Sequence, residues 1–307
     1  MNIDKIRDII SGEWDLNASD LRILNYNKRL YSTIATAILR TQSGVRRFII
    51  KETNSNPEHA VRLASRAREI FKHDADVFLP RLVFDRASGL IISEMFAGAS
   101  LQDYCRVSYR QNPLKWRSNL ETAVARTGKW LATYHATSRR MDNCESYSYY
   151  DYLSPRRKLL EYLPGDLGRQ LESWAKTHII RTRAIIHGDY SPHNVLIDRR
   201  RICVIDFGIE EWTEMSPVWD LATMTTSLEK NLRFSWRSPF RWSQKRIKKI
   251  IEVFLKSYGC DIDRNSYGLG CALCHLVAFG EERQGSPTAI WHLRELTRGL
   301  SGYDNFI

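Results

Sequence analysis

"HGDYSPHNVLI", residues 187–197, joins a polar loop to a short apolar run. The loop contains Asp189 and Asn194, and the apolar run is typical of a buried strand. After a turn of charged residues the chain returns through "ICVIDFG", residues 202–208, which carries Asp206. The sequence therefore predicts a hairpin that brings Asp206 back beside Asn194, at the ends of two paired strands.

Three side chains of this predicted hairpin offer oxygen atoms to a ligand. Asp189 lies five residues before Asn194, so a carboxylate, a carboxamide and the second carboxylate of Asp206 would converge. Such ligands suit Mg²⁺, a hard cation that keeps several waters and binds substrate phosphates. A zinc site would contain more histidine and cysteine. We therefore expect a magnesium and phosphate site at this hairpin.

The first third of the chain reads as mostly β. Residues 33–42 and 45–52 are β-rich runs around a Ser-Gly turn, which predicts a hairpin. A helix follows, with Asn56 as its N-cap and Pro57 at its first position. Residues 81–96 predict a second hairpin, so the expected order is hairpin, helix, hairpin.

The pattern becomes helical after Gly98. The predicted fold class is α+β, with a β-rich nucleotide-binding lobe over residues 1–97 and a helical catalytic and acceptor-binding lobe over residues 98–307. A crevice between lobes is a usual place for a ligand. The most apolar stretch, residues 269–280, is too short to span a bilayer and is better read as a buried helix.

The spacing of the polar residues resembles that of a known family. His-Gly-Asp, then Asn five residues after Asp189 and Asp-Phe-Gly seventeen residues after it, looks like the catalytic core of the aminoglycoside phosphotransferase and choline kinase-like superfamily. "GKWLATYHA" (128–136), "SPVWDLA" (216–222) and "FLKSYG" (254–259) extend the resemblance over most of the chain. The resemblance implies a bilobal fold like that of the protein kinases, and phosphoryl transfer from ATP.

The resemblance also implies roles for the polar residues of the second lobe. Asp189 would accept or orient the proton of an attacking hydroxyl, and Asn194 and Asp206 would hold the Mg²⁺ ions that bridge the ATP phosphates. His187 would brace the loop. Asp220 would accept hydrogen bonds from the loop backbone below it.

The nucleotide-binding residues implied by the resemblance lie in the first lobe. Lys51 ends the strand "FIIK", like the kinase lysine that holds the α- and β-phosphates. Glu69, eighteen residues on, would be its helix carboxylate, with Glu58 as the alternative. Backbone groups of Glu94 and Phe96 would bind adenine at the hinge.

The first lobe lacks the G-x-G-x-x-G loop that covers the phosphates in protein kinases. The corresponding turn is therefore expected near "RLYST", residues 29–33. Ser32 and Thr33 would then offer hydroxyl and N–H donors to the phosphates.

The distance between two motifs restricts the kind of acceptor. Only fourteen residues separate Asp206 from Asp220, which leaves no room for the longer segment on which protein kinases dock a peptide. A compact acceptor fits better, such as a sugar, an amino alcohol or an antibiotic hydroxyl. We expect a kinase of a small hydroxyl compound and favour a sugar or glycan, with anionic and lipid-linked forms included.

Charge supports an anionic partner. The formal net charge is +11, and residues 98–307 hold 31 basic and 23 acidic residues. Within them, residues 230–249 hold eight basic residues, no acidic one and four interleaved aromatics. This composition suits an anionic membrane surface, although a solvated helix face explains it equally well. No nucleic-acid-binding module is recognisable, so no nucleic acid is expected as a partner.

Two other functions are possible for this sequence. An antibiotic phosphotransferase, acting on an aminoglycoside or a macrolide, is the first alternative. A non-catalytic nucleotide-binding relative is the second, although the intact set of Lys51, Asp189, Asn194 and Asp206 argues against it. Six cysteines and a charged N-terminus without a signal peptide predict a cytoplasmic protein, with the inner face of the membrane as a further option.

Overall fold

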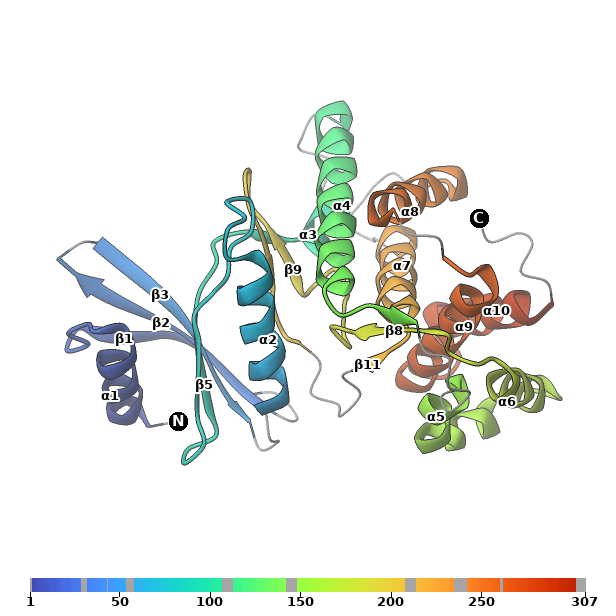
Figure 1. The fold of residues 1–307 in the computed structure, drawn as a ribbon, viewed down its shortest axis with the longest axis horizontal. Helices are drawn as coiled ribbons and strands as arrows, with labels where there is room; N and C mark the ends of the chain where they lie inside the picture. Colours follow the sequence, from blue (N-terminus) through green and yellow to red (C-terminus); the bar gives the residue numbers. More distant parts are fainter. Residues whose placement is uncertain are drawn as a thin grey trace. The chain divides into compact units, whose positions relative to one another are not determined.

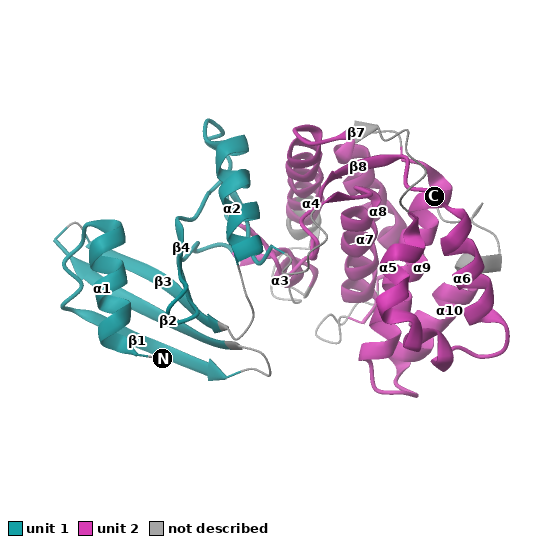
Figure 2. Cartoon of the chain, turned by 60° about the horizontal axis from the view of Figure 1, so that its bottom comes forward, with its two compact units in different colours: residues 1–98, 198–211 teal, residues 99–197, 212–307 magenta. Residues whose placement is uncertain are grey.

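The computed structural model places the chain in two compact units (Figure 2). The first unit contains residues 1–98 and 198–211, and the second contains residues 99–197 and 212–307. The described residues are 2–28, 32–42, 44–53, 58–106, 113–141, 148–207, 214–234, 242–259 and 262–301. The Asn56 and Pro57 of the predicted helix start lie outside them.

The first unit is built on a five-stranded antiparallel sheet, with the order β1-β2-β3-β5-β4 (Figure 1). Both predicted hairpins are confirmed, since β2 pairs with β3 and β4 pairs with β5. The predicted helix between them is confirmed as α2. The elements of this unit are α1 (Ile3–Trp14), β1 (Leu21–Lys28), β2 (Ser32–Thr41), β3 (Gly44–Thr53), α2 (Glu58–Phe71), β4 (Leu82–Asp85), β5 (Leu90–Glu94) and β10 (Ile202–Val204).

Helix α1 covers one face of this sheet and was not identified from the sequence. Its Ile6, Ile10 and Trp14 recur every fourth residue, so they share one face of the helix and are buried. Asn2 caps the helix by accepting hydrogen bonds from the first-turn backbone. The buried side chains of the sheet that share this core are Leu21, Ala35, Ala37, Leu39, Phe48, Ile50, Leu90 and Ile92.

Residues 198–211 belong to the first unit because their backbone bonds to it. Ile202 forms a parallel bridge with Val77. Its carbonyl accepts a hydrogen bond from the N–H of Phe78, and its own N–H donates to the carbonyl of Asp76, both at 2.8 Å. The sequence analysis had placed this stretch in the helical lobe, since bonds between residues so far apart in sequence are not visible in a local pattern.

The second unit is mainly helical, which is as predicted, and its short strands form small sheets. Strand β6 pairs with β9, and β8 lies between β7 and β11. Its elements are β6 (Ala99–Ser100), α3 (Leu101–Arg106), α4 (Pro113–Ala136), β7 (Arg140–Met141), α5 (Tyr149–Leu153), the 3₁₀ helix η1 (Ser154–Tyr162), α6 (Leu167–Thr177), β8 (Thr182–Ile185), β9 (Val195–Ile197), β11 (Glu214–Met215), α7 (Val218–Arg233), α8 (Gln244–Tyr258), α9 (Arg264–Glu281) and α10 (Pro287–Ser301).

Close helix packing fixes the core of the second unit. Helix α4 packs against α8, and α9 packs against both α7 and α10. A Cβ added to Gly128 would lie 2.6 Å from the carbonyl oxygen of Phe254, so only glycine permits this approach of α4 to α8. Residues 269–280 lie in α9, which confirms the predicted buried helix. Among the described helices, none is long and apolar enough to cross a bilayer.

Candidate active site

The loop before Asp189 is held from below by the carboxylate of Asp220, as the resemblance implied. Asp220 lies in the first turn of α7 and is fully buried. Its Oδ2 accepts a hydrogen bond from the N–H of His187 at 2.6 Å, and its Oδ1 accepts one from the N–H of Gly188 at 3.0 Å. Gly188 has φ +85°, a conformation that favours glycine, which explains the His-Gly-Asp order.

Two further supports of this loop were not assigned from the sequence. His135, near the end of α4, places its Nε2 3.0 Å from Asp220 Oδ2. Its Nδ1 lies 3.0 Å from the hydroxyl of Tyr258, at the end of α8. Both residues lie in stretches that carried the family resemblance, 128–136 and 254–259. That resemblance was the sequence feature that could have identified them. The three side chains form a buried chain of hydrogen bonds that links α8, α4 and α7 to the loop.

Asn194 orients Asp189 directly. Its Nδ2 donates to both the backbone oxygen and the Oδ2 of Asp189, each at 2.9 Å. Because Nδ2 makes both bonds, the amide orientation follows, and Oδ1 is the atom that remains as an acceptor. Within the described residues, Asn194 Oδ1 and Asp189 Oδ1 have no hydrogen-bond partner. Asp189 is half exposed whereas Asn194 is buried, so the loop presents one oxygen of each side chain.

The histidines of this loop are supports. His187 is fully buried, and its Nδ1 accepts a hydrogen bond from the N–H of Asp189 at 3.2 Å. His193 is more exposed and bonds to the hydroxyl of Ser191. Tyr190 packs edge-on against His187, and its burial raises the pKa of the phenol well above its usual range. The buried side chains of His187 and Tyr190 therefore support the loop that carries Asp189.

Lys51 and Asp206, predicted separately, lie together in the first unit. Lys51 Nζ is 3.4 Å from Asp206 Oδ1, and Asp206 Oδ2 has no hydrogen-bond partner among the described residues. Lys51 stands on β3 opposite Ile34, on the other side of the strand from the buried Ile50. Asp206 has φ +53°, an uncommon left-handed conformation for an aspartate, which turns the chain directly after β10.

The structure does not bring either helix carboxylate to Lys51. Glu69 is exposed and pairs with Lys72 at 3.8 Å, and Glu58 pairs with Arg86 at 2.5 Å. The buried face of α2 consists of Leu63, Ala67 and Phe71. Glu69 is two residues beyond Ala67, about 200° around the helix, and so points away from that face.

The two predicted hinge residues, Glu94 and Phe96, differ in whether their backbone N–H is already hydrogen-bonded. The N–H of Glu94 already donates to the carbonyl of Arg81 at 3.2 Å. Phe96 is buried and stacks on Phe78 with ring centroids 5.0 Å apart. Among the described residues, none accepts a hydrogen bond from the Phe96 N–H. This N–H is therefore one backbone donor that the hinge can offer to a ligand.

Ser32 and Thr33 begin β2, where they pair with Thr53 and Glu52. Thr33 is largely buried in the sheet. The rest of the predicted phosphate turn, residues 29–31, lies outside the described residues.

The donor atoms fit a magnesium ion. Asn194 Oδ1 and the carboxylate of Asp206 are hard oxygen ligands, of the type that holds Mg²⁺ together with water and phosphate. Within the described ranges there is no group of three or more histidine, cysteine or acidic side chains that could hold a metal. Asn194 and Asp206 lie in different units, so their convergence stays a prediction.

Comparison with known proteins also identifies a phosphotransferase. Residues 34–244 match the phosphotransferase enzyme family. No curated protein matches the sequence. Choline kinase from Cryptosporidium parvum Iowa II is a structural match, with 12% identity, 98% of this chain and 96% of that chain covered, and a TM-score of 0.61.

Two further structural matches act on different compounds. Macrolide 2'-phosphotransferase from Brachybacterium faecium shares 16% identity over 95% of this chain and 98% of that chain, with a TM-score of 0.53. Glucosamine kinase, solved with glucosamine, ADP and inorganic phosphate, shares 13% identity over 98% of this chain and 95% of that chain, also with a TM-score of 0.53. At these identities the matches establish the α+β kinase-like fold, and the family match establishes the reaction class. The chain belongs to the phosphotransferase enzyme family and is a small-molecule kinase.

Proposed function

We propose that this kinase transfers the γ-phosphoryl group of ATP to a hydroxyl group of a sugar or glycan, including anionic or lipid-linked forms. One observation carries the catalytic part of the proposal. Asn194 holds Asp189 at Oδ2, while Asp189 Oδ1 has no hydrogen-bond partner among the described residues. A half-exposed carboxylate with one oxygen held and one oxygen available is suited to accept a proton from an acceptor hydroxyl.

In the proposed reaction, Asp189 Oδ1 accepts the proton of the acceptor hydroxyl as its oxygen attacks the γ-phosphorus. The new oxygen–phosphorus bond forms while the bond to the bridging oxygen of ADP breaks, and that oxygen leaves with the electron pair. Asn194 keeps Asp189 in position throughout. Asn194 and Asp206 would hold Mg²⁺, which neutralises phosphate charge when it is bound.

The first unit supplies the proposed nucleotide site. The ammonium group of Lys51, which lies beside Asp206, would neutralise the α- and β-phosphates. The Phe96 N–H is a donor for adenine, and Ser32 and Thr33 are the proposed contacts for the phosphates. The solved glucosamine kinase contains ADP, which supports an adenine nucleotide as donor.

The choice of acceptor rests on the length and charge of the chain. The short stretch between Asp206 and Asp220 favours a compact molecule over a peptide. The strongly basic second part of the chain favours an anionic acceptor over a polycation such as an aminoglycoside. An antibiotic phosphotransferase remains the alternative, because a macrolide phosphotransferase shares the fold.

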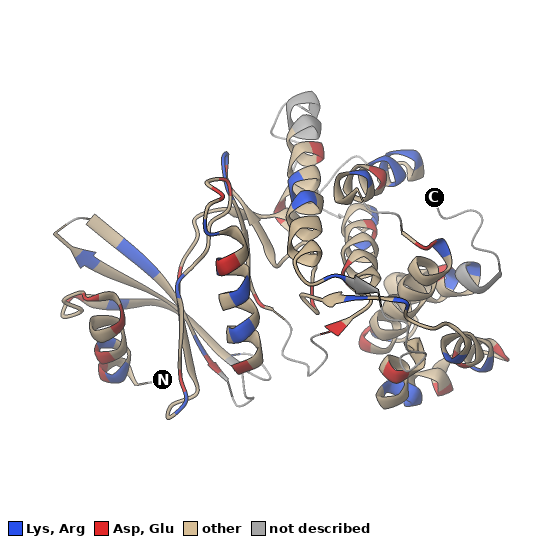
Figure 3. Cartoon of the chain, viewed as in Figure 1, with Lys and Arg blue, Asp and Glu red and all other residues tan. Residues whose placement is uncertain are grey.

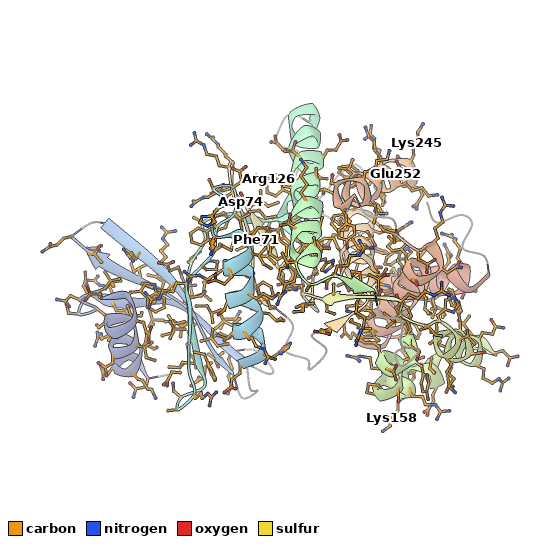
Figure 4. The ribbon with its side chains drawn as sticks, viewed as in Figure 1. Phe71, Asp74, Arg126, Lys158, Lys245 and Glu252 are labelled. Atoms are coloured by element: carbon orange, nitrogen blue, oxygen red, sulfur yellow. The ribbon has the colours of Figure 1, made fainter. Side chains whose placement is uncertain are left out.

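We further propose that residues 230–249 contact an anionic membrane surface. On α8, Lys245, Arg246 and Lys248 are exposed, while Ile247 and Ile250 are buried. Figure 3 shows several lysine and arginine positions along this helix, and in Figure 4 the side chain of Lys245 projects away from it. Two of the four aromatic residues of the segment, Trp236 and Phe240, lie outside the described residues. The alternative is a solvated helix face.

Two measurements test these proposals. A screen for acceptor-dependent ADP production over sugars, amino alcohols and antibiotics should give turnover with a sugar. Turnover only with an antibiotic would replace the favoured acceptor by the alternative. For the membrane, co-sedimentation should be stronger with anionic than with neutral liposomes, and equal binding to both would remove the membrane contact.

A further inference from the structure

One arginine of the first unit contacts two stacked aromatic rings. The rings of Phe78 and Phe96 have centroids 5.0 Å apart and an angle of 28° between their planes. The guanidinium carbon of Arg201 lies 5.2 Å from the centroid of Phe78 and 5.4 Å from that of Phe96. Both distances are within the range of a cation–π contact, so a single cation interacts with both rings.

The guanidinium group of Arg201 is held by the turn between β9 and β10. Asp198 Oδ2 accepts hydrogen bonds from Nε and Nη2 of Arg201, each at 3.3 Å. Asp198 Oδ1 accepts hydrogen bonds from the backbone N–H groups of Arg200 and Arg201, at 2.7 and 2.5 Å. Because one carboxylate bonds to both the backbone and the side chain of Arg201, the guanidinium group has a defined direction.

Phe78 is fixed next to this turn by backbone hydrogen bonds. Its N–H donates to the carbonyl of Ile202, whose own N–H donates to the carbonyl of Asp76, both at 2.8 Å. Phe78, Phe96 and Arg201 all belong to the first unit, so their contacts lie within one compact body. Phe78 is half-buried, whereas 45% of the Arg201 side chain is exposed. The guanidinium group therefore lies on the solvent side of this cluster.

The ring of Phe96 holds the hinge at the point where N–H bonding to the sheet ends. The N–H of Met95 still donates to the carbonyl of Arg47, at 2.9 Å. The N–H of Phe96 has no backbone acceptor among the described residues. Phe96 is 5% exposed, so its buried ring fixes this residue where its N–H does not. The direction of that N–H therefore depends on the contacts of the ring.

We propose that Arg201 is a positioning residue for the nucleotide, which holds Phe78 and Phe96 together and so orients the Phe96 N–H toward adenine. The proposal rests on the proposed adenine contact of Phe96. A donor that is already oriented loses less conformational freedom when its ligand binds, so the affinity is higher. Arg201 does not itself touch the nucleotide, and its effect is confined to the adenine end of the site.

Two nucleotides separate the adenine contact from the rest of the nucleotide site. ATP has a ring-nitrogen acceptor at N1, beside the N6 amine, whereas 1-deaza-ATP has a C–H group at that position. Titration calorimetry of the full chain with Mg²⁺ measures both affinities. The parent chain should bind ATP about tenfold more tightly than 1-deaza-ATP, because the analogue leaves the hinge donor without an acceptor.

Three substitutions in one turn test the role of Arg201. Arg201→Gln removes the cation and should weaken ATP binding about threefold to tenfold, while the affinity for 1-deaza-ATP changes by less than about twofold. Arg201→Lys keeps a cation beside the rings without the planar guanidinium group and should restore part of the ATP affinity. Arg199→Gln is the matched control, since Arg199 is an exposed arginine of the same turn that contacts no described aromatic ring. Its affinities should equal those of the parent chain.

The outcomes separate this proposal from the proposed function. If the parent prefers ATP and Arg201→Gln keeps the full preference, the adenine contact stands and the role of Arg201 is refuted. If Arg201→Gln weakens both nucleotides by the same factor, Arg201 acts on the fold or on the phosphates, and the positioning role is again refuted. Equal affinities of the parent for both nucleotides would instead remove the adenine contact on which the proposal rests.

Discussion

Asn194 donates a hydrogen bond from Nδ2 to Oδ2 of Asp189 at 2.9 Å, and this contact orients the carboxylate of the catalytic loop. The same amide nitrogen also bonds to the backbone oxygen of Asp189. The two side chains therefore hold each other in position. One side-chain oxygen of each, Oδ1, has no hydrogen-bond partner among the described residues. The proposed proton acceptor, Asp189, and the proposed metal ligand, Asn194, therefore lie side by side.

Replacement of Asp189 by asparagine should lower kcat by about 10²- to 10⁴-fold, because the proton acceptor is lost while the shape is kept. ATP binding should be retained, since the proposed nucleotide contacts lie in the first unit. Steady-state kinetics and nucleotide titration measure the two effects. His193→Ala is the comparison and should retain most of the activity, and near-normal turnover in the Asp189 variant would refute the assigned mechanism.

The Asp206→Ala substitution should remove the Mg²⁺ dependence of ATP binding and leave Lys51 without its partner. A charge-assisted contact is worth about 1.5–3 kcal/mol, so the affinity for ATP with Mg²⁺ should fall by roughly one to two orders of magnitude. Calorimetry with and without Mg²⁺ provides the measurement. Asp20→Ala, at an exposed position of the same unit, is the control, and an unchanged metal dependence in Asp206→Ala would exclude the metal role.

Loss of the Asp220 carboxylate should destabilise the second unit. Asp220→Ala leaves the N–H groups of His187 and Gly188 and the imidazole of His135 without their buried acceptor. The free energy of unfolding should fall by about 3–5 kcal/mol in chemical denaturation. Asp4→Ala, at an exposed site, should change it by less than about 0.5 kcal/mol. Equal effects of the two substitutions would show that the buried network contributes little.

Two glycine-to-alanine substitutions should have opposite effects. At Gly128 the new Cβ would lie 2.6 Å from the Phe254 carbonyl oxygen, so α4 and α8 must separate, at a cost of about 1–3 kcal/mol. Gly12 lies within α1 with open space around it, and alanine there should stabilise by about 0.5–1 kcal/mol. Melting temperatures that shift in the same direction would contradict this account of the α4–α8 contact.

The buried histidine pair predicts a loss of stability in acid. Burial lowers the pKa of His275 to about 3 and that of His292 to about 4, with nearby positive groups contributing further. Both pKa values lie below 6.5, so the unfolded state binds more protons as the pH falls. The stabilisation is complete above pH 6.5 and declines below it, by up to about 1.4 kcal/mol per pH unit and histidine.

Denaturant titrations between pH 4.5 and 7.5 can measure this dependence. The double variant His275→Gln/His292→Gln removes both titrating groups from the Nδ1–Nδ1 contact at 2.9 Å. Its stability should vary less with pH than that of the parent chain. If both proteins lose stability in parallel, other groups account for the acid sensitivity.

Local sequence patterns were sufficient to predict the helices and strands whose formation depends on residues close together in the chain. The β-rich runs of β2 and β3, the start of α2 and the apolar stretch of α9 can each be read within one segment. The spacing from Asp189 to Asn194 likewise anticipated their contact, because five residues form one loop. Helix α1 was not predicted, although its core residues Ile6, Ile10 and Trp14 recur every fourth residue.

The sequence alone determined the reaction class, through the order and spacing of Asp189, Asn194, Asp206 and Asp220. Tertiary structure decided which partner each side chain has. Lys51 lies beside Asp206 and not beside Glu69, because strand pleating and the rotation of α2 set their directions. His135 and Tyr258 support Asp220 from helices far apart in sequence.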